Sequence, residues 1–165
     1  MSLFRIFSMF EIQNATGDTG QCPDIMYNTR SLEQALYLGK LRRVMINQER
    51  LVNTFCELVK IDSPSEEEEA IAQHLTGGLV RLGFTVDRDA YGNLIASEEG
   101  ADPLMLSAHM DTVEPGRSIK PQVVGDRIES DGTTILGGDC KAGLAAIMES
   151  LESRAEDGTP RRPVQ

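Results

Sequence analysis

Three side chains in the middle of the chain have the types and the order of a metal-binding site. His109 and Asp111 are separated by one residue, and Asp139 follows a Gly-Gly pair further along the chain. Imidazole nitrogens and carboxylate oxygens are common ligands of divalent zinc. A carboxylate beside a ligating imidazole can accept its other ring N–H and so fix the tautomer. Asp139 has two carboxylate oxygens and can bridge two cations.

The elements around these residues predict where they lie. The apolar run Leu104 to Leu106, closed by small residues, is typical of a buried strand in an α/β sheet. His109 and Asp111 follow where this strand ends, and strand residues two apart point to the same face. Open α/β sheets bind ligands at the carboxyl ends of their strands. We therefore expect both side chains to face one ligand site.

Each of these residues also has an ordinary structural interpretation. A single histidine such as His109 is more often a core residue with satisfied hydrogen bonds than a ligand. Asp111 could be a turn residue, and Asp139 could cap the helix that follows it. Cys140 lies near the start of that helix, where a thiol can be activated as a nucleophile. The longer sequence pattern decides between these interpretations.

Two segments resemble the M20 family of metallopeptidases, and within it the peptidase T-like branch. The matching text is Ser-Ala-His-Met-Asp-Thr-Val-Glu-Pro-Gly at 107–116 and Asp-Gly-Thr-Thr-Ile-Leu-Gly-Gly-Asp-Cys-Lys-Ala-Gly at 131–143. Either motif alone is a weak signal, whereas both in this order are specific. The resemblance extends from about Met45 to Ser153, roughly two thirds of the chain.

The resemblance implies a fold, a site and a reaction. The fold is α/β, with a mixed, mainly parallel sheet flanked by helices. His109 and Asp139 would be metal ligands, with Asp139 bridging two ions, and Asp111 would be the catalytic residue that orients the imidazole. Two zinc ions, or manganese or cobalt, would activate a water that hydrolyses the peptide or amide bond of a short peptide. Metal-bound hydroxide is then a better nucleophile than Cys140.

The chain departs from the family pattern at several positions. Cys140 stands where relatives often have Asp, and the resemblance gives that position no ligand role. Lys141 is expected to face solvent or a neighbouring carboxylate. The family's Glu-Glu pair, whose first member is the general base, a further acidic ligand and a last histidine have no counterpart here. The runs Glu66 to Glu69 and Glu98-Glu99 precede the histidine motif and are not that pair.

These departures limit the activity that we expect. With two direct ligands and no general base, this truncated chain alone should bind metal weakly and should not turn over peptides. The alternative is a non-catalytic α/β fragment or interaction module derived from such a peptidase. An incomplete domain should also expose part of its core and its sheet edge, which predicts association.

Composition excludes several classes of protein. The formal net charge is −10, whereas nucleic-acid binding needs clustered Lys and Arg. No apolar run approaches the length of a membrane span. The three cysteines are widely spaced and do not form a disulfide pattern, which favours free thiols in the cytoplasm.

Hydrophobic periodicity predicts most of the elements. Helices are expected at Gln48 to Lys60, from a Ser65–Glu68 capping box to Gly83, and from Lys141 to about Arg154. His74, in the second of these helices, is interpreted as structural. Hairpins are expected at 84–96 and 123–129. We divide the chain into an extension without family resemblance at 1–44, partly disordered with a helix at 31–43, a catalytic-domain portion at 45–156, and a loop tail at 157–165.

Overall fold

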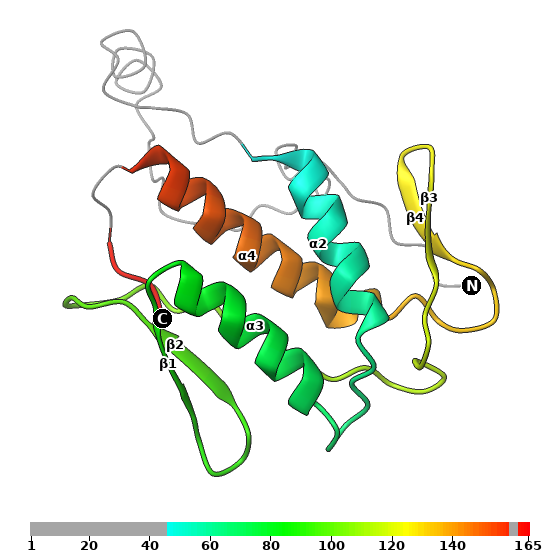
Figure 1. The fold of residues 1–165 in the computed structure, drawn as a ribbon, viewed down its shortest axis with the longest axis horizontal. Helices are drawn as coiled ribbons and strands as arrows, with labels where there is room; N and C mark the ends of the chain where they lie inside the picture. Colours follow the sequence, from blue (N-terminus) through cyan, green and yellow to red (C-terminus); the bar gives the residue numbers. More distant parts are fainter. Residues whose placement is uncertain (1–45, 159–161) are drawn as a thin grey trace, which may run out of the picture. The chain divides into compact units, whose positions relative to one another are not determined.

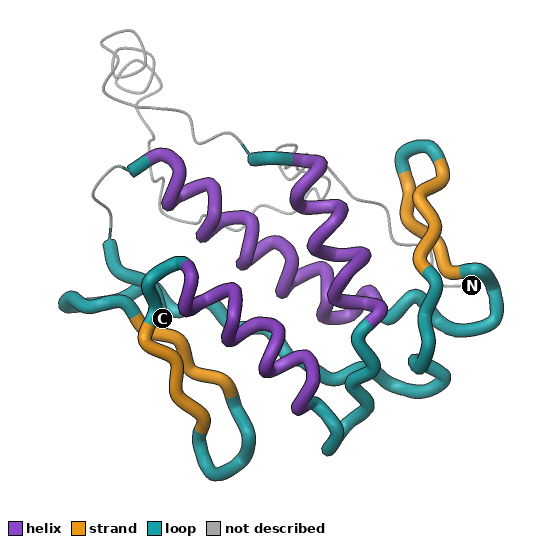
Figure 2. Tube along the Cα trace, in the orientation of Figure 1, coloured by secondary structure: helices purple, strands orange, loops and turns teal. Residues whose placement is uncertain are grey.

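The computed structural model describes residues 46–158 and 162–165, and the predicted extension at 1–44 lies outside the described residues. The described elements are three helices and four short strands (Figures 1 and 2). The helices are α2 Gln48–Lys60, α3 Glu69–Arg81 and α4 Gly138–Asp157, and the strands are β1 Thr85–Arg88, β2 Leu94–Ser97, β3 Pro121–Val124 and β4 Arg127–Ser130. The chain is thus α/β in content, as expected.

The helices confirm the hydrophobic periodicity. Helix α2 begins after Asn47, whose side chain accepts a hydrogen bond from the Arg50 amide. Helix α3 ends just before Gly83, which has a φ of 90° that favours glycine. The predicted capping box is wrong, because Glu68 precedes the helix and makes no side-chain cap bond. The Ser65 hydroxyl instead donates to a carboxylate far along the chain, described below.

Both predicted hairpins are confirmed. β1 pairs antiparallel with β2, with Thr85 opposite Ser97, and β3 pairs antiparallel with β4, with Pro121 opposite Ser130. Each hairpin is a separate two-stranded sheet. Gly125 in the second turn has a φ of 62°, the left-handed conformation that a tight hairpin turn requires.

The apolar segment before the histidine motif differs from the prediction. It is not assigned as a strand, and its parallel pairing is a single bridge between Leu104 and Val164. The amides of Leu104 and Leu106 donate to the carbonyls of Pro163 and Gln165, both over 2.8 Å. A mainly parallel sheet is therefore not seen in the described part of the chain. Among the described residues, the segment 163–165 lies alongside it.

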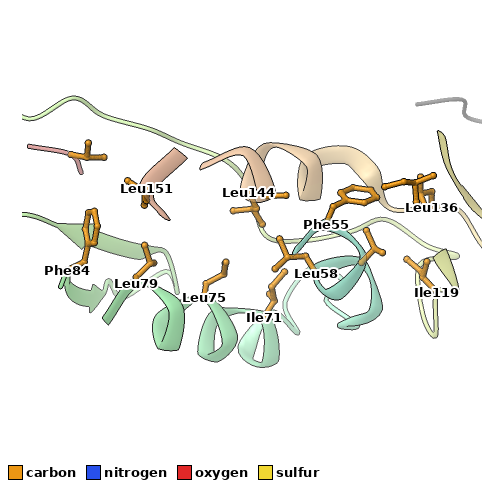
Figure 3. Packing of buried hydrophobic residues seen from close by; sticks show 14 residues of the cluster. Phe55, Leu58, Ile71, Leu75, Leu79, Phe84, Ile119, Leu136, Leu144 and Leu151 are labelled. Atoms are coloured by element: carbon orange, nitrogen blue, oxygen red, sulfur yellow. The ribbon is translucent and has the colours of Figure 1, made fainter. Parts of the chain in front are cut away.

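The hydrophobic core joins the three helices to the segments between and after them (Figure 3). Its fully buried members include Leu58 on α2 and Ile71 on α3, and Leu144 of α4 is 8% exposed. Leu106 packs against this core, whereas its neighbour Met105 is 74% exposed. The segment that leads to His109 is therefore covered by core on one face and open on the other.

A buried ion pair fastens α2 to α4. Glu149 is 2% exposed and accepts from Arg50 Nε at 2.6 Å, from the Asn47 amide at 2.7 Å and from the Ser153 hydroxyl at 2.6 Å. Burial raises the pKa of the Glu149 carboxyl, but the hydrogen bonds from Arg50 and Ser153 outweigh it and hold the pKa below its usual value.

No helix in the described ranges is long and apolar enough to cross a membrane.

Candidate metal centre

Asp111 holds the imidazole of His109 in a defined orientation. The Nδ1 atom of His109 lies 2.9 Å from Oδ1 of Asp111, and the Ser65 hydroxyl donates to Oδ2 at 2.6 Å. The Ser65 hydrogen bond lowers the pKa of Asp111, which burial would raise, and the contact with His109 lowers it further. An ionised carboxylate only accepts hydrogen bonds, so the neutral imidazole carries its proton on Nδ1. Its Nε2 lone pair is then free to bind a cation.

Asp139 meets His109 at this free nitrogen. Its Oδ1 atom lies 3.5 Å from His109 Nε2, although 30 residues separate the two in sequence. Two ligand atoms at 2.0–2.2 Å from a tetrahedral zinc lie roughly 3.4 Å apart. The spacing of these atoms therefore fits two ligands of one ion.

The turn before α4 places the Asp139 side chain. Gly137 has a φ of 66°, and an added Cβ would lie 3.0 Å from Ile119 and 3.1 Å from Thr112, so both strain and contact favour glycine. Asp139 and Cys140 have non-helical backbone angles, and the peptide bond between them is cis. The regular helix thus starts at Lys141, as predicted, and Asp139 stands before it with its side chain 86% exposed.

Cys140 completes a cluster that sequence reasoning did not anticipate. His109, Asp139 and Cys140 each offer one ligand atom, and these atoms all lie within 4.8 Å of one another. The resemblance had given Cys140 no ligand role. Its position directly after Asp139 is the signal that could have identified it, since neighbouring residues outside the regular helix can turn to a common point.

Lys141 is buried, so the expectation that it faces solvent is wrong, and its direct hydrogen-bond partners are a hydroxyl and a carbonyl rather than a carboxylate. It is 1% exposed, and its Nζ donates to the Ser63 hydroxyl and, over 2.8 Å, to the Met110 carbonyl. Burial lowers the pKa of Lys141 to about 8, against the attraction of Asp111 and Glu68.

Ser63 also forms hydrogen bonds with the backbone of the histidine motif. Its hydroxyl donates to the Met110 carbonyl at 3.0 Å, and its own carbonyl accepts from the Thr112 amide at 2.8 Å. Met110 lies between His109 and Asp111. The backbone of the histidine motif is thus held by hydrogen bonds from both Ser63 and Lys141.

The other polar residues singled out from the sequence lie elsewhere. His74 is exposed on α3 and is not part of the cluster. In the acidic run at the start of α3, Glu67 pairs with Arg117 and Glu69 pairs with Arg88, as expected of a solvated helix start. Neither contributes to the candidate site.

The donor set fits a zinc ion. It combines one imidazole nitrogen, one carboxylate oxygen and one sulfur, which are the three kinds of protein ligand that zinc takes. Asp111 supplies the carboxylate partner that a metal-bound histidine usually has on its second nitrogen.

Comparison with known proteins shows what the chain as a whole is similar to. No family model matches the chain. An uncharacterized protein of Bacillus subtilis, YqjE, is 41% identical over 130 residues, 70% of this chain and 35% of that protein. The cytosol non-specific dipeptidase of Escherichia coli is 30% identical over 122 residues, 64% of this chain and 25% of the dipeptidase.

Solved structures give the same result. A tripeptidase from Staphylococcus aureus superimposes with a TM-score of 0.70 at 42% identity, covering 73% of this chain and 36% of the tripeptidase. The aminopeptidase PepT from Bacillus cereus gives a TM-score of 0.67 at 43% identity, covering 72% and 35% of the two chains. The chain thus spans a quarter to about a third of the length of these relatives.

Proposed function

Because this chain is homologous to the N-terminal part of M20-family peptidases, we propose that it provides the first metal ligands for metal-dependent hydrolysis of peptide or amide bonds. The observation that carries the proposal is the 3.5 Å approach of Asp139 Oδ1 to His109 Nε2. Residues 45–156 are then the N-terminal part of a catalytic domain. Its substrates would be short peptides, as in the dipeptidase and tripeptidase relatives.

Each residue has a separate task in this proposal. Asp111 keeps the proton of His109 on Nδ1, so that Nε2 stays a ligand. Asp139 adds a carboxylate oxygen and keeps a second one for another ion. Bound zinc, or manganese or cobalt, would lower the pKa of a bound water and polarise the scissile carbonyl. Lys141 and Ser63 hold the backbone that presents His109.

The described residues offer no general base beside His109 and Asp139. Asp111 is engaged by both His109 and Ser65, and a carboxylate with a lowered pKa is a poor proton acceptor. We therefore propose that this chain binds metal but does not turn over peptides by itself.

Zinc titration of the whole chain by isothermal calorimetry tests the proposal. We expect binding by the wild type and its loss in His109→Ala and Asp139→Ala. The matched control is His74→Ala, which removes the other histidine and should bind as the wild type does. Equal zinc affinity in His109→Ala and His74→Ala would contradict the proposed role of His109 as a ligand. Hydrolysis of dipeptides or tripeptides by the purified chain contradicts the predicted inactivity.

The compartment and the sheet are part of the same proposal. Cys56 and Cys140 are free thiols, which suits the reducing cytoplasm.

The parallel bridge from Leu104 to Val164 would be one pairing of the mainly parallel sheet that the family resemblance implies.

One observation favours the alternative, an interaction module. Near the histidine motif, Met105 is 74% exposed and Val113 is 70% exposed. Large apolar side chains in such positions favour association. Sedimentation velocity of the wild type and of Met105→Lys tests the interaction module: a shift from larger species to monomer in the variant supports association through Met105.

A further inference from the structure

We propose that the Cys140 thiolate is the third ligand of the zinc ion that His109 and Asp139 share. This inference rests on the proposed function, because it adds a ligand to the same centre. A third ligand raises the affinity for zinc that we expect of this chain by itself. Two protein ligands hold zinc weakly, whereas three with an open fourth position form the usual catalytic type of site.

The backbone brings the three ligand atoms to one point. Asp139 and Cys140 both precede the regular part of α4 and have φ/ψ values of −93°/115° and −105°/24°. Their side chains are therefore free of the helical arrangement, in which consecutive residues point about 100° apart. All three ligand atoms lie within 4.8 Å of one another. Nitrogen and sulfur ligands of a tetrahedral zinc lie about 3.6 Å apart, so the ligand atoms need to move closer by roughly 1 Å at most to bind one ion.

The chain leaves space for the sulfur. An added Cβ at Gly143 would lie 2.7 Å from Cys140 Sγ, which is closer than real contacts allow. Glycine at 143 therefore lets the thiol occupy its present position beside the next helical turn. Cys140 is half-buried, whereas Asp139 is exposed, so the thiol approaches a bound ion from the protein side and Asp139 from the solvent side.

The ligand type predicts the choice of metal. A thiolate is a soft ligand that prefers zinc, cobalt and cadmium to manganese or magnesium. On binding, the thiol loses its proton to solvent and the sulfur donates a lone pair to the cation. This chain should thus select zinc over manganese, a choice that imidazole and carboxylate ligands alone would make less sharply.

Cobalt titration of the whole chain tests the proposal by spectroscopy. We expect the wild type to show a thiolate-to-cobalt charge-transfer absorption in the near ultraviolet, and Cys140→Ser to lack it. Cys56→Ser is the matched control, because this thiol, the second among the described residues, lies on α2 outside the cluster, and the variant should keep the band. Zinc affinity should fall at least tenfold in Cys140→Ser and stay unchanged in Cys56→Ser.

Residue-resolved alkylation gives an independent readout. Zinc should protect Cys140 from iodoacetamide and leave Cys56 unprotected, as read by peptide mass spectrometry. Thermal unfolding of Cys140→Ser without metal verifies that the variant folds. If the wild type binds zinc through His109 but shows no cobalt–thiolate band and no loss in Cys140→Ser, the third-ligand proposal is overturned while the metal site stands. If the wild type binds no metal, both are overturned.

Discussion

The Nζ atom of Lys141 lies 2.8 Å from the carbonyl oxygen of Met110, the residue between His109 and Asp111. A buried cation thus supports the backbone of the candidate metal site from inside the protein. Lysine is rarely buried to this degree without hydrogen-bonding partners. Here Ser63 and Met110 provide oxygen acceptors, although neither provides a full negative charge.

This arrangement predicts how stability depends on pH in the metal-free chain. The pKa of Lys141 falls from 10.5 to about 8 on folding because burial penalises its charged form. Between these two values the unfolded chain binds more protons at this group, so stability rises with pH through the window. The gain is on the order of 3 kcal/mol. Lys141→Met should lack this rise, as measured by urea unfolding at both ends of the window.

Lys120→Met is the matched control for this experiment. The Lys120 side chain is 72% exposed and pairs with Asp131, so its removal should leave the wild-type pH dependence intact. Parallel stability curves for the wild type and Lys141→Met would contradict the predicted burial effect.

Asp111→Asn should weaken zinc binding by about 10–100-fold, the usual cost of losing a carboxylate that orients a ligating histidine. The amide removes the negative charge that holds the proton on His109 Nδ1. Ser65→Ala should act in the same direction and less strongly, because it removes one hydrogen bond to the carboxylate. Competition titration against a zinc indicator measures both. Asp126→Asn, in the β3–β4 turn, is the control, and equal affinity in all four proteins would disprove the orienting role.

Arg50→Met should destabilise the chain by on the order of 3 kcal/mol, because it leaves the Glu149 carboxylate buried without its charged partner. The double variant Arg50→Met/Glu149→Met should be more stable than the single one, since no unpaired charge remains. Because the pKa of Glu149 is lowered, its contribution is present above pH 4.5 and lost as pH falls through the folded value. Chemical unfolding at neutral and acidic pH checks these points. A double variant less stable than Arg50→Met would contradict the role of Arg50 as the charged partner of buried Glu149.

Val164→Ala should cost about 1–2 kcal/mol in free energy of unfolding, because the side chain is 7% exposed and packs on the core. Val124→Ala is the matched control, since Val124 is 52% exposed and a surface change of this size stays within about 0.5 kcal/mol. Thermal unfolding of the two variants decides. Equal losses would show that the carboxyl-terminal residues do not pack as described.

Elements with strong local signals could be predicted from the sequence. The apolar period of α2 and α3 and the turn residues of both hairpins fixed these elements to within a few residues. The approach of His109 to Asp139 followed from matching two motifs to a family rather than from periodicity.

What could not be predicted depends on contacts between distant residues. Ser65 matches the local pattern of a capping box. Its hydroxyl instead donates a hydrogen bond to Asp111, which lies 46 residues away in the sequence. Lysine is a residue type usually found at the surface. The burial of Lys141 is explained by its hydrogen bonds to Ser63 and Met110, which lie far away in the sequence. The pairing of Leu104 with Val164 joins segments that no local pattern connects.

The Asp139 side chain is 86% exposed and that of His109 is half exposed, so the centre opens directly to solvent. An ion held there exchanges with the surrounding solution without any opening of the protein. Metal analysis of a purified sample will then report the buffers and chelators it has passed through. Identifying the ion carried in the cell requires capture before lysis.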